Sequence, residues 1–510
     1  MSTTRASATD TRAEVSGGTV RGFVSGELRH WRGMPYAAAP VGELRFRAPK
    51  PVEPWDGVRD ASRFGAISHQ SRISLGAPQR LVPQSEDCLS INVIAPPTNT
   101  PVARPVMVFI HGGAYTAGSS REIPRLGEAL VRQGDVVFVN FNYRLGAFGY
   151  LDFSRYSTAE RPFDTNLGLR DQLTALRWVR DNIREFGGDP DNVTVFGESA
   201  GATAITTMLA VPSARGLFAR AIIESAAPAA VYPSELTTQW GADFVEILRE
   251  VADNTTASPS HLLATTDAAT LTRAATIMRQ RTPDAVPGTI AFAPVIDGEL
   301  LPQHPLDAAA DGRTHAVPII IGTNAREGSL FRGRLDLLAS TRPRIRAVFA
   351  RTEREDRRRL FDEYRALPRR TSAAQFGGDY SFWYPSIRFA EGHALHAPVH
   401  FYRFDLGTRA LRLAGLDATH GLELFAIFDL GDTPLALAGG VLGGRQAFKR
   451  AGARMRERWL SFARNGAVGE NWPTYSIADR ETLIIDIADR VERDPNQSRR
   501  SAWQAFVPHL

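Results

Sequence analysis

The segment NVTVFGESAGATAITTMLA, residues 192–210, joins an apolar run to a run of small, helix-compatible residues through one Gly-x-Ser-x-Gly motif. Residues 192–197 are typical of a buried strand, and residues 200–210 can continue as a helix. A sharp strand-to-helix turn exposes the hydroxyl of its serine, and Gly197 and Gly201 relieve the backbone crowding around Ser199. The motif alone is short enough to arise by chance, so the rest of the chain has to supply a fold and partners for the serine.

Apolar runs alternate with helix-period segments along most of the chain, which predicts an α/β fold with a mainly parallel sheet covered by helices on both faces. One amphipathic helix is expected between residues 166 and 186, where apolar residues recur at spacings of three and four before Gly187 and Gly188. Besides residues 192–197, strands are predicted at residues 106–110, 136–143, 221–225, 317–323 and 400–406.

We expect a disordered leader over residues 1–13, followed by a single domain over residues 14–510. Two helix-rich insertions fall around residues 231–290 and 325–375. They either roof the site or form a plain structural subdomain.

Composition excludes several classes of protein. The chain has 510 residues, 43% of them hydrophobic, a net charge of +5 and a single cysteine, Cys88, so an intrachain disulfide is impossible. No stretch is apolar for the roughly 18 residues that a membrane helix needs, and the N-terminus lacks the apolar core of a secretory signal, so a cytoplasmic protein without membrane attachment is expected. The basic residues are scattered among 55 acids without a recognition motif, which argues against a nucleic-acid partner.

A second glycine-rich turn follows the predicted strand at residues 106–110. His111, Gly112, Gly113 and Ala114 form a turn whose small residues let the backbone approach a substrate oxygen closely. We expect the amides of Gly113 and Ala114 to join the amide of Ala200, at the start of the helix after Ser199, in an oxyanion hole.

These motifs and others along the chain resemble the type-B carboxylesterase family of the α/β-hydrolase fold, over residues 14–508. The other matching stretches include GMPYAAAPVGELRFRAPKPVEPWDG (33–57), SEDCLSINV (85–93), NYRLGAFGYL (142–151), GTNAREGSLF (322–331), GLDATHGLEL (415–424) and NWPTY (471–475). The resemblance implies a serine carboxylesterase that hydrolyses small-molecule esters through an acyl-enzyme, with no cofactor and no metal.

The resemblance also supplies the partners of Ser199. It implies that Glu327 is the catalytic acid and His420 the catalytic histidine, which gives the order Ser, acid, His expected of this fold. From the residues alone, Asp297 and Asp336 remain alternatives for the acid. Glu198 and Ser225 match positions that the family uses to polarise and steady the histidine.

An apolar substrate pocket is predicted from proximity to these motifs, with core packing as the equal alternative. Its members are Tyr115, Phe331, Phe425 and Phe428. The cluster of His393, His396 and His400 is not expected to bind a metal, because Pro398 interrupts a common helix and no cysteine completes a ligand set.

Secreted members of the family pair the cysteine of the EDCL segment with one about twenty residues earlier. Ser68 stands at that earlier position here. The loop is therefore expected to hold its shape without the disulfide.

Two alternative functions remain open from the sequence. An amidase, a carbamate hydrolase or a lactonase would use the same triad on another acyl group. A non-catalytic scaffold would share the fold, but such members usually lose the serine or the histidine.

Overall fold

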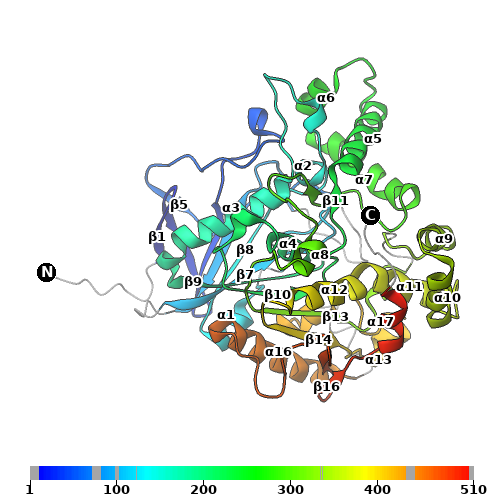
Figure 1. The fold of residues 1–510 in the computed structure, drawn as a ribbon. Coiled ribbons are helices and arrows are strands. Elements are labelled where there is room, and N and C mark those ends of the chain that lie inside the picture. Colours follow the sequence, from blue (N-terminus) through cyan, green and yellow to red (C-terminus); the bar gives the residue numbers. More distant parts are fainter. Residues whose placement is uncertain are drawn as a thin grey trace.

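A mixed sheet of eleven strands runs through the described part of the chain (Figure 1). The computed structural model describes residues 11–71, 82–97, 103–121, 123, 125–332, 335, 337–431 and 443–504. In sheet order from β8 to β15, every strand is parallel to its neighbours. At one edge β6, β4 and β3 follow β8, and each pairs antiparallel with the strand before it. At the other edge β16 pairs antiparallel with β15. In sheet order the strands are β16 (Arg490–Arg493), β15 (Glu481–Ile485), β14 (Val399–Phe404), β13 (Ile319–Asn324), β10 (Arg220–Glu224), β9 (Gly188–Glu198), β7 (Arg104–Ile110), β8 (Val137–Phe141), β6 (Ser90–Ala95), β4 (Leu28–Pro35) and β3 (Phe23–Ser25).

The central strands are buried on both faces because their side chains alternate between two apolar cores. On β7, Val106 and Val108 belong to one core, whereas Met107 and Phe109 belong to the other. Every residue of β9 from Val193 to Glu198 is buried. The predicted helix coverage of both faces is therefore confirmed.

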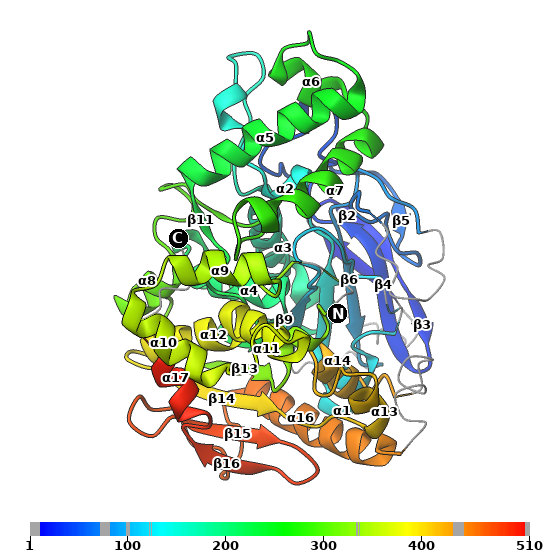
Figure 2. The ribbon, with the colours of Figure 1, turned by 90° about the vertical axis from the view of Figure 1, so that its right-hand side faces the viewer.

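Helices α3, α4 and α12 contact one face of the sheet, while α1 and α16 contact the other and α14 packs on α16 (Figure 2). Their bounds are α1 (Glu128–Gly134), α3 (Leu167–Asn182), α4 (Ala200–Met208), α12 (Tyr384–His393), α14 (Leu422–Ile427) and α16 (Arg445–Asn465). The expected amphipathic helix at residues 166–186 is α3 with its 3₁₀ extension η3 (Ile183–Phe186). No helix in the described ranges is both long and apolar enough to span a bilayer.

The two helix-rich insertions are present. Helices α5, α6 and α7 gather at one end of the molecule, at the top of Figure 2, and α9, α10 and α11 form the second group. The remaining elements are β1 (Arg12–Val15), β2 (Gly18–Arg21), β5 (Val58–Asp60), β11 (Tyr232–Pro233), β12 (Val295–Ile296), α2 (Ala147–Tyr150), α5 (Ser234–Ala252), α6 (Pro259–Thr265), α7 (Ala268–Ala285), α8 (Pro305–Ala310), α9 (Arg342–Ala350), α10 (Arg354–Glu363), α11 (Arg370–Gly378), α13 (Arg409–Leu413), α17 (Gln497–Trp503), η1 (Gly42–Leu44), η2 (Ser154–Tyr156), η4 (Pro212–Ala214), η5 (Glu327–Ser329) and η6 (Asp379–Trp383).

The six predicted strands correspond to β7, β8, β9, β10, β13 and β14, with ends shifted by a few residues. Strands β4, β6 and β15 were not predicted. Most of the expected leader, residues 1–10, lies outside the described residues. The predicted end of the leader at residue 13 is wrong, because Arg12 and Ala13 pair with β2 in a small separate sheet.

Candidate active site

Ser199 occupies the sharp turn between β9 and α4. Its φ of 57° and ψ of −122° are unusual for a residue with a side chain. A Cβ on Gly201 would lie 2.0 Å from the carbonyl oxygen of Ile110, and a Cβ on Gly197 would lie 2.7 Å from the same oxygen. Both glycines are therefore needed for β7 to approach the turn, and the Ser199 amide fixes it from the other side by donating to the Glu224 carbonyl at 2.9 Å.

His420 and Glu327 form a short hydrogen bond, 2.6 Å from Nδ1 to Oε2, and both side chains are buried. Glu327 lies in the 3₁₀ turn η5, just beyond the carboxyl end of β13. Its other oxygen, Oε1, accepts hydrogen bonds from the Asn324 amide at 2.6 Å and from the Ser225 hydroxyl at 2.7 Å. The carboxylate is therefore held in place before it orients the imidazole.

The second ring nitrogen of His420, Nε2, lies 3.1 Å from Oε1 of Glu198. This pair is close enough for a charge interaction, but Nε2 has no hydrogen-bond partner of favourable geometry among the described residues. Burial lowers the pKa of His420, whereas the carboxylates of Glu198 and Glu327 raise it more strongly, to about 9. Glu198 thus lies beside the histidine, whereas Ser225 lies beside Glu327, the hydrogen-bond partner of the histidine.

A further buried carboxyl, Glu423, was missed by sequence reasoning. The Ser225 hydroxyl lies 2.7 Å from Glu327 and 3.1 Å from Glu423, and the Asn324 side-chain amide donates to Glu423. Burial, with Glu327 and Glu198 nearby, raises the pKa of Glu423 to about 8.

A serine hydroxyl carries one proton and cannot donate to two carboxylates at once. A protonated Glu423 that donates to Ser225, while Ser225 donates to Glu327, satisfies all three groups. The position of Glu423, three residues after His420, was the feature of the sequence that could have indicated its place in this network.

The turn from Gly112 to Tyr115 packs against the nucleophile, since a Cβ on Gly112 would lie 3.0 Å from Cβ of Ser199. Gly113, Ala114 and Tyr115 have φ values of 112°, 52° and 56°, so three consecutive residues adopt positive φ. Within the described part of the chain the amides of Gly113, Ala114 and Ala200 donate to no protein acceptor. All three residues line the same cavity as Ser199 and His420.

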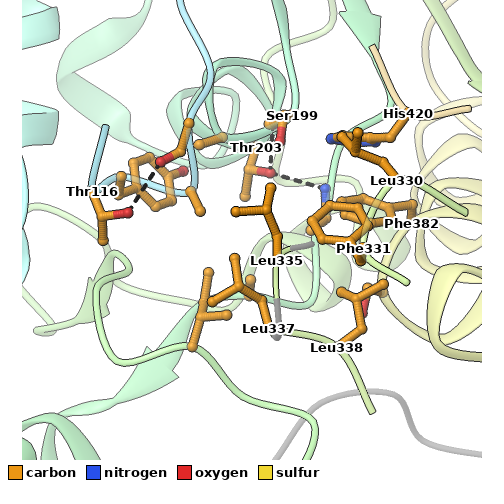
Figure 3. A pocket seen from close by; sticks show the side chains of 18 of the residues that line it. Thr116, Ser199, Thr203, Leu330, Phe331, Leu335, Leu337, Leu338, Phe382 and His420 are labelled. Atoms are coloured by element: carbon orange, nitrogen blue, oxygen red, sulfur yellow. Dashed lines mark hydrogen bonds between the residues drawn. The ribbon is translucent and has the colours of Figure 1, made fainter. Parts of the chain in front are cut away.

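That cavity has a volume of about 260 Å³ and is mainly apolar. Figure 3 shows Ser199 and His420 on its wall together with leucine and phenylalanine side chains. The rings of Phe331 and Phe382 pack on the imidazole of His420, with centroids 5.3 and 4.4 Å from it. These rings keep water away from the histidine, which strengthens its interactions with the nearby carboxylates.

Two of the four predicted pocket residues, Tyr115 and Phe331, line the cavity. The prediction was wrong for Phe425 and Phe428, which pack in the core on the opposite face of the sheet. Phe428 contacts Phe109 with a centroid distance of 5.0 Å. Helix α14 begins just after His420, and at its C-terminal end the Phe428 ring packs on Phe109, Phe138 and Phe196 of the sheet.

The other candidates that the structure describes have structural roles. His393 and His396 share the hydroxyl of Thr314, at 3.0 and 2.8 Å, while His400 faces the Pro473 carbonyl. The described residues contain no group of three or more histidine, cysteine or acidic side chains placed to hold a metal. Asp297 accepts bonds from the loop amides of Leu300 and Leu301 away from Ser199, and Asp336 lies outside the described residues.

Cys88 is buried, and burial raises the pKa of its thiol to about 12. The Ser68 hydroxyl lies beside the thiol and also accepts a hydrogen bond from the Leu145 amide at 3.1 Å. Ser68 thus ties its loop to the core through a hydrogen bond.

The chain is similar to known proteins over most of its length. The family profile described as "Carboxylesterase family" matches residues 9–504. The chain is 37% identical to a para-nitrobenzyl esterase of Bacillus subtilis, with 95% of this chain and 96% of that protein covered. It is 32% identical to an acylcarnitine hydrolase of Mus musculus, covering 93% and 86%.

Among solved structures, the chain superposes on a PNB esterase with a TM-score of 0.84 at 35% identity, over 97% of this chain and 100% of the other. That esterase has the α/β-hydrolase fold, so the fold expected from the sequence is confirmed.

Proposed function

This chain belongs to the carboxylesterase family and is a carboxylic ester hydrolase, and from that premise we propose that Ser199, His420 and Glu327 form its catalytic triad. The single observation that carries the proposal is the 2.6 Å bond between His420 and Glu327, at the wall of the cavity that also contains Ser199. A serine hydroxyl needs an imidazole to accept its proton, and the imidazole needs an acid to orient it.

The reaction proceeds through an acyl-enzyme. Ser199 attacks the ester carbonyl while His420 accepts the hydroxyl proton, and Glu327 stabilises the imidazolium. The amides of Gly113, Ala114 and Ala200 bind the oxygen that becomes negative.

His420 then returns the proton to the leaving alcohol, which departs and leaves the acyl group on Ser199. Water, activated by the same histidine, releases the acid and restores the serine.

The charge around His420 sets the pH at which this base works. With a pKa of about 9, only about 1% of the imidazole is neutral at pH 7. The neutral form is the one that accepts the serine proton, so kcat/KM should rise with pH up to about 9. In return, the carboxylates of Glu198 and Glu327 stabilise the imidazolium that forms during attack.

The test is hydrolysis of p-nitrophenyl esters of increasing acyl length by the wild type and by Ser199→Ala. Ser213→Ala, which changes an exposed serine, is the matched control. We expect Ser199→Ala alone to lose nearly all activity, by a factor of at least about 10⁴. Equal slow hydrolysis by the wild type and Ser199→Ala would overturn the proposal.

Two further measurements probe the mechanism. A fluorophosphonate should label the wild type at Ser199 and label His420→Ala far more slowly; fast labelling of that variant would remove His420 as the base. Matched anilides and carbamates test whether another acyl group is preferred over the ester.

We further propose one catalytic domain, predicted from residue 14 onward and extended to include β1, acting in the cytoplasm. The sheet, which includes strands from both halves of the chain, supports a single domain. The lone cysteine, which cannot form an intrachain disulfide, supports a reducing compartment.

A further inference from the structure

Arg279 is a half-buried arginine of helix α7 that lines the cavity containing Ser199. Together with Thr116 it also lines a second, smaller cavity of about 20 Å³. The two side chains therefore stand where the main cavity meets the smaller one. No motif points to Arg279, because it lies in a helix-rich insertion without one.

The guanidinium of Arg279 has no hydrogen bond or ion pair with any residue in the described part of the chain. Two fully buried arginines differ from it: Arg144 pairs with Asp171 at 2.7 Å, and Arg344 pairs with Asp284 at 2.7 Å. Burial alone accounts for the lowered pKa of Arg279, with no neighbouring carboxylate acting on it. A partly desolvated guanidinium without a partner is costly, so a ligand that supplies one gains binding free energy.

The charges on the cavity wall identify that ligand. Among the described lining residues, the charged or basic side chains are Glu198, His420 and Arg279. Glu198 and His420 lie 3.1 Å apart and face one another, which leaves Arg279 as the uncompensated charge. A guanidinium binds a carboxylate through two parallel hydrogen bonds, whereas a neutral amide or ester offers it a weaker acceptor.

We propose that Arg279 selects esters that carry a carboxylate remote from the bond that is cleaved. The inference rests on the proposed function of Ser199, because the carboxylate and the ester bind in the same cavity. The rest of the wall suits the apolar chain between them, since Ile290, Leu335 and Leu337 line it. Arg279 touches no reacting atom in this arrangement, so it acts on binding and specificity.

The test compares matched substrates that differ only in charge. For a carboxylate on the acyl side, the pairs are monomethyl adipate with methyl adipamate, and monomethyl suberate with its amide. For a carboxylate on the alcohol side, the pair is 4-acetoxybenzoate with 4-acetoxybenzamide. Each is assayed with the wild type, Arg279→Met, Arg279→Lys and Arg281→Met, a change on the same helix at an exposed arginine.

We expect the wild type to favour the carboxylate member of at least one pair by about tenfold to a hundredfold in kcat/KM, mainly through a lower KM. Arg279→Met should abolish that preference, so that the two members of each pair have nearly equal kcat/KM. Arg279→Lys should keep part of the preference, and Arg281→Met should keep it whole. Added salt should weaken it.

Two results would overturn the inference: no preference for the carboxylate in any pair, or a preference that survives in Arg279→Met. Failure of the proposed function is distinguishable, because the wild type would then fail to hydrolyse the neutral members as well. The pair that shows the preference tells whether the carboxylate belongs to the acid or to the alcohol.

Discussion

Replacement of Glu198 by glutamine should separate the two effects that this carboxylate has on His420. Its Oε1 lies 3.1 Å from Nε2, and it is the strongest of the groups that raise the pKa of the histidine from 6.5 to about 9. Two charges at that distance interact by about 1.3 kcal/mol in a water-like dielectric and several times more in a protein-like one. Since 1.36 kcal/mol corresponds to 1 in pKa, the variant should have a pKa lower by at least about 1.

The pH profile of kcat/KM follows from this shift. In Glu198→Gln the rising limb should move to lower pH by the same amount, because the imidazole becomes neutral at a lower pH. The plateau above about pH 9 should fall about tenfold or more, because the imidazolium formed during attack loses the same stabilisation. Below the pKa the two effects cancel, so the variant and the wild type should have nearly equal rates at pH 6.

The assay is pH-stat hydrolysis of a methyl ester between pH 6 and 10, which avoids the alkaline breakdown of activated esters. Glu43→Gln, a change at an exposed carboxylate, controls for the altered net charge. An unmoved limb with an equal loss at every pH would show that Glu198 acts only on the transition state. An unchanged profile would refute the charge interaction altogether.

Two other variants test the buried network. Ser225→Ala removes the hydroxyl that donates to Glu327 at 2.7 Å, so kcat should fall by about five- to thirtyfold with KM little changed, as measured by steady-state kinetics; a change confined to KM would contradict this. Glu423→Gln tests the raised pKa: the folded chain keeps a proton on Glu423 that the unfolded chain releases above about pH 4.5, so wild-type stability should fall between about pH 5 and 8. As the pH rises over this range, the Tm of the variant should therefore increase relative to that of the wild type. A difference in Tm that stays constant with pH in thermal melts would mean that Glu423 is charged throughout.

Local patterns in the sequence predict local structure well. The turn at Ser199 and the glycines around it are encoded within seven residues, because steric crowding at one turn requires them there. The central strands are short apolar runs buried on both faces, so each of them can also be predicted from its own residues. The antiparallel strand β4 lies toward the edge of the sheet and mixes charged with apolar residues, so its sequence does not stand out.

Contacts between distant segments could not be derived in this way. Glu327 and His420 are 93 residues apart, and only the family resemblance brought them together before the structure did. Phe428 was misassigned because nearness to His420 in the chain does not fix the direction of a side chain at the end of a short helix. Phe382 and Arg279 reach the cavity from segments without any motif, and their roles depend on how these segments pack.

The buried environment of Cys88 makes the chain a convenient background for probes. The sequence has one thiol, which is buried. Its pKa is raised to about 12, so the thiol stays protonated at neutral pH. Reagents that need a thiolate should therefore leave the folded wild type unmodified. A cysteine introduced on an exposed turn of α7, near Arg279, would then be the one site that takes a fluorophore, and its signal would report directly on ligands entering the cavity.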